Sequence, residues 1–143
     1  MNQGYHETKE KMSNSLYIVW KEGNNTGIPI IDEQHRGIIS TINSLHYFIQ
    51  NGDSEKILQP TLVTLKQYTF IHFKTEEAII AKAGYPDLEE HCALHQGLAE
   101  KTDHVYQEAI TNKDHKLVLS FLRDWWLNHI VRIDSKYVPF VIK

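Results

Sequence analysis

Long apolar runs, paired cysteines and an excess of positive charge are all missing from this sequence of 143 residues. No apolar stretch approaches the length that a membrane span needs, so we expect no membrane-spanning segment. The single cysteine, Cys92, excludes an intrachain disulfide and fits a reducing compartment. The stretch 1–15 is polar and has no apolar signal core. These absences predict a cytoplasmic protein.

The charge balance is close to neutral, with a formal net charge of −3. Such a balance gives no electrostatic reason to expect nucleic acid or an anionic membrane as a partner. The length suits one domain that can bury a core without disulfides. Nothing in the composition identifies a protein partner, and we expect a monomer.

Apolar residues recur at alternating spacings of three and four along four stretches, about 32–50, 54–83, 86–111 and 115–133. This is the pattern of amphipathic helices with one buried stripe each. Asp32 is the expected N-cap of the first, and Gly84 is expected to end the second. Because the connections are short, consecutive helices should be antiparallel neighbours. The sequence therefore predicts an all-α fold, an up-down-up-down antiparallel four-helix bundle over residues 20–143, with an N-terminal arm over residues 1–19.

Two pairs of polar side chains lie on the apolar stripes of the central helices. His72 and Glu76 are four residues apart, and so are His91 and His95. Four residues turn an α-helix by about 400°, so each pair projects within ~40° of one direction, into the core. The outer helices add candidates of the same chemical kind, which are His35, His129 and Asp134.

Each of these residues has an ordinary explanation when it is taken alone. A single histidine on an apolar face is usually a core residue bonded to a carbonyl, and a His-x-x-x-Glu pair is common on solvated helix faces. Here, however, all four stripes carry ligand-type side chains, and no lysine or arginine shares the stripe of Glu76. Because an unpaired buried carboxylate is costly, the combination predicts a metal site.

The number and type of ligands predict which metal is bound. Seven ligands are too many for one structural zinc, and calcium and magnesium prefer oxygen. Imidazole with carboxylate suits iron, and zinc, copper and manganese fit less well. Five imidazoles, two bridging carboxylates and a bridging oxo or hydroxo group would leave one position of two octahedral irons open. The Glu-x-x-His repeat of oxygen-activating bundles is absent from the central helices, which favours reversible binding of a small diatomic molecule.

His129 and Asp134 present a geometric difficulty. They are five residues apart, which places them about 140° apart on a regular α-helix, so both cannot face one point. We therefore predict either a π-type turn or a helix end between them.

Four stretches of the sequence resemble the hemerythrin family, in particular its bacterial single-domain members. These stretches are 27–35, 68–77, 91–95 and 126–134, and the resemblance extends over about residues 20–140. All seven candidate ligands stand at positions where the family has the same residue types. Where the family often has Leu-Met after its glutamate pair, this chain has Ala78, Ile79 and Ile80.

The resemblance implies a particular division of the ligands. His91, His95 and His129 would hold one iron, His35 and His72 the other, and Glu76 and Asp134 would bridge the two. O2 would bind the iron with two histidines, while both irons pass from ferrous to ferric and back. The expected walls of the O2 pocket are Ile38, Ile39, Ile79, Ile80 and Trp125. In the oxidised state, azide or a similar small anion should take the place of O2.

Three classes of function are compatible with these residues. The leading hypothesis is an O2-binding protein for storage, transport or delivery, which is not an enzyme. The second is a sensor module for O2 or redox state, although sensors usually carry an attached signalling domain. The third is a di-iron enzyme of the wider HHE group, such as a peroxidase, a nitric-oxide-handling protein or an iron-sulfur repair protein.

Overall fold

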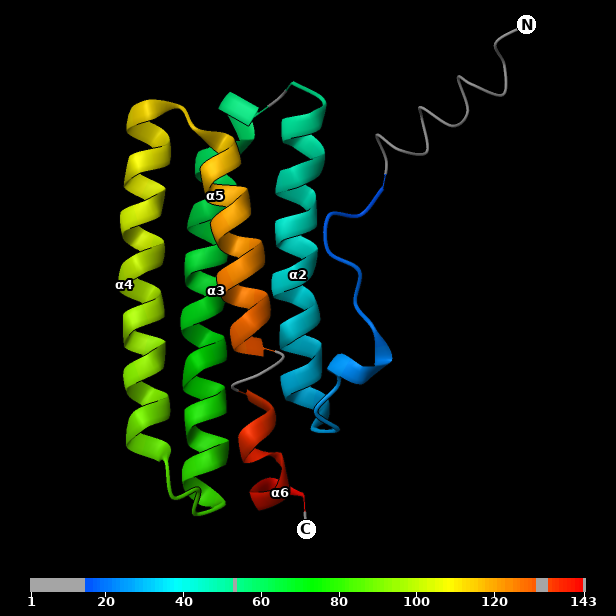
Figure 1. The fold of residues 1–143 in the computed structure, drawn as a ribbon, viewed down its shortest axis with the longest axis vertical. Coiled ribbons are helices and arrows are strands. Elements are labelled where there is room, and N and C mark those ends of the chain that lie inside the picture. Colours follow the sequence, from blue (N-terminus) through cyan, green and yellow to red (C-terminus); the bar gives the residue numbers. More distant parts are fainter. Residues whose placement is uncertain (1–14, 53, 131–133, 143) are drawn as a thin grey trace, which may run out of the picture.

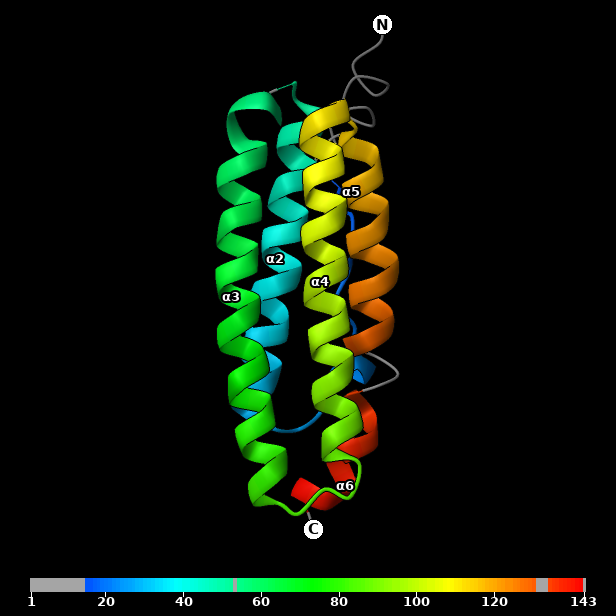
Figure 2. The ribbon, with the colours of Figure 1, turned by 90° about the vertical axis from the view of Figure 1, so that its left-hand side faces the viewer.

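Four long helical segments lie side by side in the structure, which is a computed structural model. The structure describes residues 15–52, 54–130 and 134–142, without the side chains of residues 54, 55 and 134. The four segments are α2 (Pro29–Gln50), α3 (Ser54–Lys82), α4 (Leu88–Asn112) and the segment that begins with α5 (His115–Phe121). Figures 1 and 2 show that their directions alternate along the chain. The described residues contain no strand, so the predicted all-α, up-down-up-down bundle is confirmed.

The helix ends follow local chemistry, with one correction at α2. This helix begins at Pro29 rather than at Asp32, and its N-cap is Ile28. Proline suits the first position because its missing N–H would have no partner there. Asp32 accepts hydrogen bonds from the backbone N–H groups of Thr26 and Gly27 at 2.7 and 3.0 Å. Its carboxylate therefore holds the preceding loop rather than capping the helix.

The fourth segment departs most from a regular α-helix. Asp114 caps α5 by accepting the backbone N–H of Leu117 at 3.0 Å. A π-helical stretch, η2 (Leu122–Trp126), follows, and residues 129 and 130 are again π-helical. The chain is next described in the 3-10 helix η4 (Asp134–Tyr137) and the short helix α6 (Val138–Val141). The predicted π-type turn is thus confirmed at residues 129 and 130, while residues 131–133 lie outside the described part.

The wider π turn changes which tryptophan faces the core. The regular pattern predicts Trp125 on the buried stripe, and this prediction is wrong. Trp125 is 38% exposed and lies beneath the amino group of Lys101, whereas Trp126 is 1% exposed. Because a π turn takes more residues per turn than an α turn, the inward face moves on by one residue after Leu122.

Two clusters of apolar side chains fill the bundle. The larger cluster includes Ile38, Leu65, Phe73, Leu98 and Trp126. The smaller one closes the opposite end and consists of Ile28, Ile31, Ile80, Tyr85 and Tyr137. Along the helices, the candidate ligands lie between residues of the larger cluster and residues of the smaller one, as His35 does between Ile38 and Ile31. Apolar side chains therefore flank the site at both ends.

Residues at the end of the predicted arm pack along α2 (Figure 1). Ile18 is buried, and it exchanges two hydrogen bonds with Asn43, at 2.8 and 2.9 Å. The predicted boundary between the arm and the bundle, at residue 20, stays a prediction. Over the described residues, no helix has the length and apolar character to cross a membrane.

Candidate metal centre

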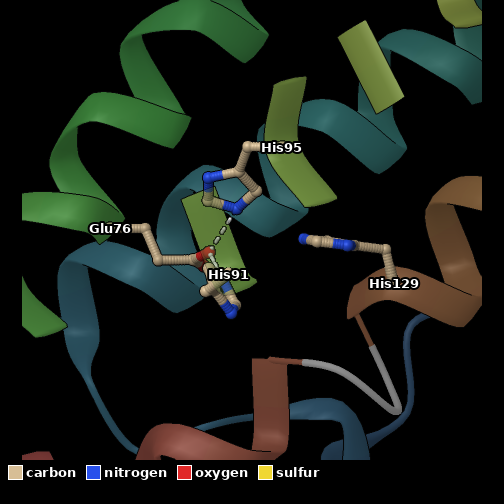
Figure 3. Close-up of side chains that lie close together, drawn as sticks. All are labelled: Glu76, His91, His95 and His129. Atoms are coloured by element: carbon tan, nitrogen blue, oxygen red, sulfur yellow. Dashed lines mark hydrogen bonds and ion pairs between the residues drawn. The ribbon is translucent and has the colours of Figure 1, made fainter. Parts of the chain in front are cut away.

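Glu76 lies at the centre of the site and is fully buried. Its Oε1 is 2.6 Å from Nε2 of His91 and 2.8 Å from Nε2 of His95. Figure 3 shows both imidazoles directed toward the Glu76 carboxylate. Its Oε2 faces the other side, 3.7 Å from Nε2 of His35 and 3.5 Å from Nε2 of His72. One carboxylate from α3 therefore contacts imidazoles from three helices.

The buried side chains form two groups with ligand atoms close enough to share an ion. The first consists of Glu76, His91, His95 and His129, and the second of His35, His72 and Glu76; within each group the ligand atoms lie within 4.8 Å of one another. Six of the seven predicted ligands are thus brought together, and Glu76 belongs to both groups. Asp134 begins η4, but its side chain lies outside the described residues.

The charge of Glu76 is maintained by its neighbours. Burial raises the pKa of its carboxyl group, but the adjacent imidazoles of His35, His72, His91 and His95 lower it well below the usual value. Within the described part of the chain, all the ion pairs of Glu76 are with histidines and none is with a lysine or arginine. A buried carboxylate is costly unless it is paired or bound to metal. Together with the surrounding imidazoles it forms a nitrogen and oxygen donor set that suits iron or another first-row transition metal.

Three further side chains, which the sequence pattern did not single out, contact the central groups. Tyr137 donates its hydroxyl hydrogen to Oε2 of Glu76 at 2.9 Å. Gln34 and Glu77 each place an oxygen 2.8 Å from an Nδ1 atom, that of His72 and of His95 respectively. Gln34 and Glu77 are chain neighbours of predicted ligands, and Tyr137 follows Asp134 by one helical turn. These positions were the only signal in the sequence.

Aromatic rings cover one side of the site. Phe73 stacks on His95 with 3.9 Å between ring centroids, and it also stacks on Trp126 with 5.5 Å between centroids. Both Phe73 and Trp126 line a groove of about 770 Å³ between α3 and α4. A layer of aromatic side chains therefore separates this groove from His95, which helps to keep water from the ligands.

The five residues expected to line the O2 pocket differ in their burial. Ile38, Ile39 and Ile80 are buried, and Ile79 is partly buried. Trp125 points away from the core, and Trp126 takes the inward position in its place. The role of the four isoleucines as pocket walls stays a prediction.

Comparison with known proteins agrees with this geometry. The family model of the hemerythrin HHE cation binding domain matches residues 26–141. Bacteriohemerythrin from Methylococcus capsulatus is 35% identical over 120 residues, covering 80% of this chain and 88% of the relative. Bacteriohemerythrin from Pseudomonas aeruginosa strain LESB58 is 32% identical over 126 residues, with 87% and 82% covered. Hemerythrin subunit alpha from Lingula reevii is 30% identical over 120 residues, with 84% and 92% covered.

The chain belongs to the hemerythrin family, since the match to the family model spans most of its length. The predicted family is therefore confirmed. Membership supports O2 binding at a non-haem di-iron site, and the buried histidine and glutamate cluster fits a metal site.

Proposed function

We propose that this chain binds O2 reversibly at two bridged irons and serves in oxygen storage, transport or delivery. The observation that carries the proposal is the sharing of Glu76 by two groups of buried histidines. One group offers three imidazoles and the other two, so each can hold one ion while Glu76 joins them. When bound, the iron pair supplies the two electrons that O2 binding requires.

The proposed ligands follow the two groups. His91, His95 and His129 hold one iron, His35 and His72 hold the other, and Glu76 bridges them. Asp134 is proposed as the second bridge from the family resemblance. Because the second iron has one imidazole fewer, we place the open position there. Azide soaked into crystals of the oxidised protein should then bind this iron alone, and azide at the iron of His91, His95 and His129 would refute the assignment.

The protein's own side chains contribute three conditions for reversible binding. Imidazole nitrogens outnumber carboxylates, so the site carries fewer anions than oxygen-activating bundles do. Apolar side chains at both ends exclude water and ions that would compete with an uncharged gas. Tyr137 holds the orientation of the Glu76 carboxylate through its hydrogen bond. We therefore propose a binding protein rather than an enzyme.

The cytoplasmic location and the monomeric state stay predictions.

The decisive experiment measures iron content and reversibility in one preparation. Protein from iron-replete growth should hold two irons per chain, and its optical spectrum should cycle between nitrogen and air without consuming reductant. Glu76→Ala should lose both iron and the spectral change, whereas the matched control His104→Ala, at an exposed position on α4, should keep them. One metal per chain would refute the di-iron proposal, and steady consumption of reductant under air would indicate an enzyme instead.

A further inference from the structure

The hydrogen bonds behind His72 determine which of its ring nitrogens carries the hydrogen. Thr75 donates its hydroxyl hydrogen to the carbonyl of Ile71 at 2.9 Å, so its oxygen is left to accept the amide N–H of Gln34 at 3.2 Å. This orients the Gln34 side chain with its oxygen toward His72, 2.8 Å from Nδ1. An oxygen acceptor requires Nδ1 to be the donor. Nε2, which lies 3.5 Å from Oε2 of Glu76, is then the ring nitrogen that would bind a metal on this side.

A different group stands behind His95. Oε2 of Glu77 lies 2.8 Å from its Nδ1, and a carboxylate can only accept, so Nδ1 again donates. The other oxygen of Glu77 is 3.5 Å from the amino group of Lys74. The Glu77 side chain is 20% exposed, so its charge is partly solvated while His95 itself is buried. Nε2 of His95 faces Glu76 at 2.8 Å.

We propose that Gln34 and Glu77 are positioning residues that make the two iron positions electronically unequal, a proposal that rests on the proposed function. Both fix their histidine as an Nε2 ligand, but one acceptor is neutral and the other is an anion. A carboxylate acceptor makes the imidazole a stronger donor to its metal than an amide does. His95 therefore stabilises the ferric state at its position, while His72 leaves the iron with the open position more easily reduced. This inequality favours the release of O2 and return to the ferrous state.

Exchange of the two acceptors tests the proposal without removing either hydrogen bond. Glu77→Gln should raise the midpoint potential of the iron pair, and Gln34→Glu should lower it, each by the equivalent of about a tenfold change in the reduced-to-oxidised ratio. Autoxidation should become slower in the first variant and faster in the second. Glu100→Gln and Gln67→Glu, at exposed positions, make the same changes of charge away from the histidines and should shift the potential much less. Shifts in the same direction, or no larger than in these controls, would overturn the proposal.

A double variant distinguishes the effect of where the acceptor's negative charge lies from the effect of the total charge near the site. Gln34→Glu with Glu77→Gln keeps the net charge of the chain but reverses the two acceptors. We expect the two Mössbauer doublets of the oxidised protein to change relative to each other in this variant. A spectrum identical to that of the unmodified protein would show that only the total charge matters, which contradicts the inequality proposed here.

The positioning role has a test that does not depend on iron or O2. In zinc-loaded protein, nitrogen NMR should show the ring hydrogen on Nδ1 of both His72 and His95. Gln34→Leu removes the acceptor and should weaken metal binding about 10- to 100-fold, whereas Gln34→Glu restores it. A ring hydrogen on Nε2 of either histidine would overturn the positioning role. Fewer than two irons per chain would instead refute the proposed function. The ring-hydrogen positions in the zinc-loaded protein would still show whether Gln34 and Glu77 position their histidines.

Discussion

Replacement of Tyr137 by phenylalanine tests how much the hydrogen bond from the Tyr137 hydroxyl to the Glu76 carboxylate contributes to the stability of the fold. The hydroxyl donates to Oε2 at 2.9 Å, and both residues are fully buried. A hydrogen bond to a charged group contributes about 1.5–3 kcal/mol. Phenylalanine keeps the ring contacts with Tyr85 and His91, so little packing is lost. We therefore expect metal-free Tyr137→Phe to lose about 1.5–3 kcal/mol of unfolding free energy.

Urea unfolding followed by circular dichroism measures this loss. The midpoint should fall by about 1 M, with an unchanged slope. Tyr85→Phe is the matched control, because Tyr85 belongs to the same apolar cluster and its hydroxyl makes no hydrogen bond to another described residue. A loss of less than about 0.5 kcal/mol in Tyr137→Phe, or one equal to that of the control, would refute the reasoning, since surface-like substitutions fall in that range.

Four further outcomes are expected. Phe73→Ala should cost about 3–5 kcal/mol of stability and speed autoxidation, because it removes the ring that covers His95. Asp32→Ala should cost about 1–3 kcal/mol by removing the acceptor of three hydrogen bonds, whereas exposed Glu33→Ala should be near neutral in the same urea assay. The pKa of Glu76 is raised by burial but lowered overall well below 4.5, so its ionisation stabilises the metal-free fold above that pH. This contribution should be lost as the pH falls further, and Glu76→Gln should lack that part of the acid limb. Removal of iron should lower the melting temperature, and equal values with and without iron would contradict metal linkage.

Local geometry explains why so much of the site was predictable from the sequence. Residues four apart on a helix share a face, so the spacing alone identifies His72 with Glu76, and His91 with His95, as inward pairs. The apolar stripes predicted the bundle for the same reason. His35 and His129 were weaker predictions, because each is a single polar residue on its stripe. Only their convergence with the other stripes identified them.

The side chains behind the ligands were not predictable, because they depend on how the helices face one another. Gln34 is on α2 and contacts His72 on α3, and Glu77 is on α3 and contacts His95 on α4. Adjacent helical residues point about 100° apart, so a neighbour of a ligand can reach the site only where another helix presents an imidazole to it. The position of Tyr137 likewise depends on the path of the chain after the fourth segment.

The sequence by itself determined the helices, their order and the residues that converge on the core, since these follow from periodicity within each helix. The tertiary structure decided the exchange of Trp125 for Trp126, because the π turn at Leu122–Trp126 shifts the inward face and the regular spacing of apolar residues does not predict it. It also decided that Asp32 holds the preceding loop instead of capping its helix. Above all, it decided that Glu76 contacts imidazoles from three helices at once, because distances between helices arise only when their stripes pack together.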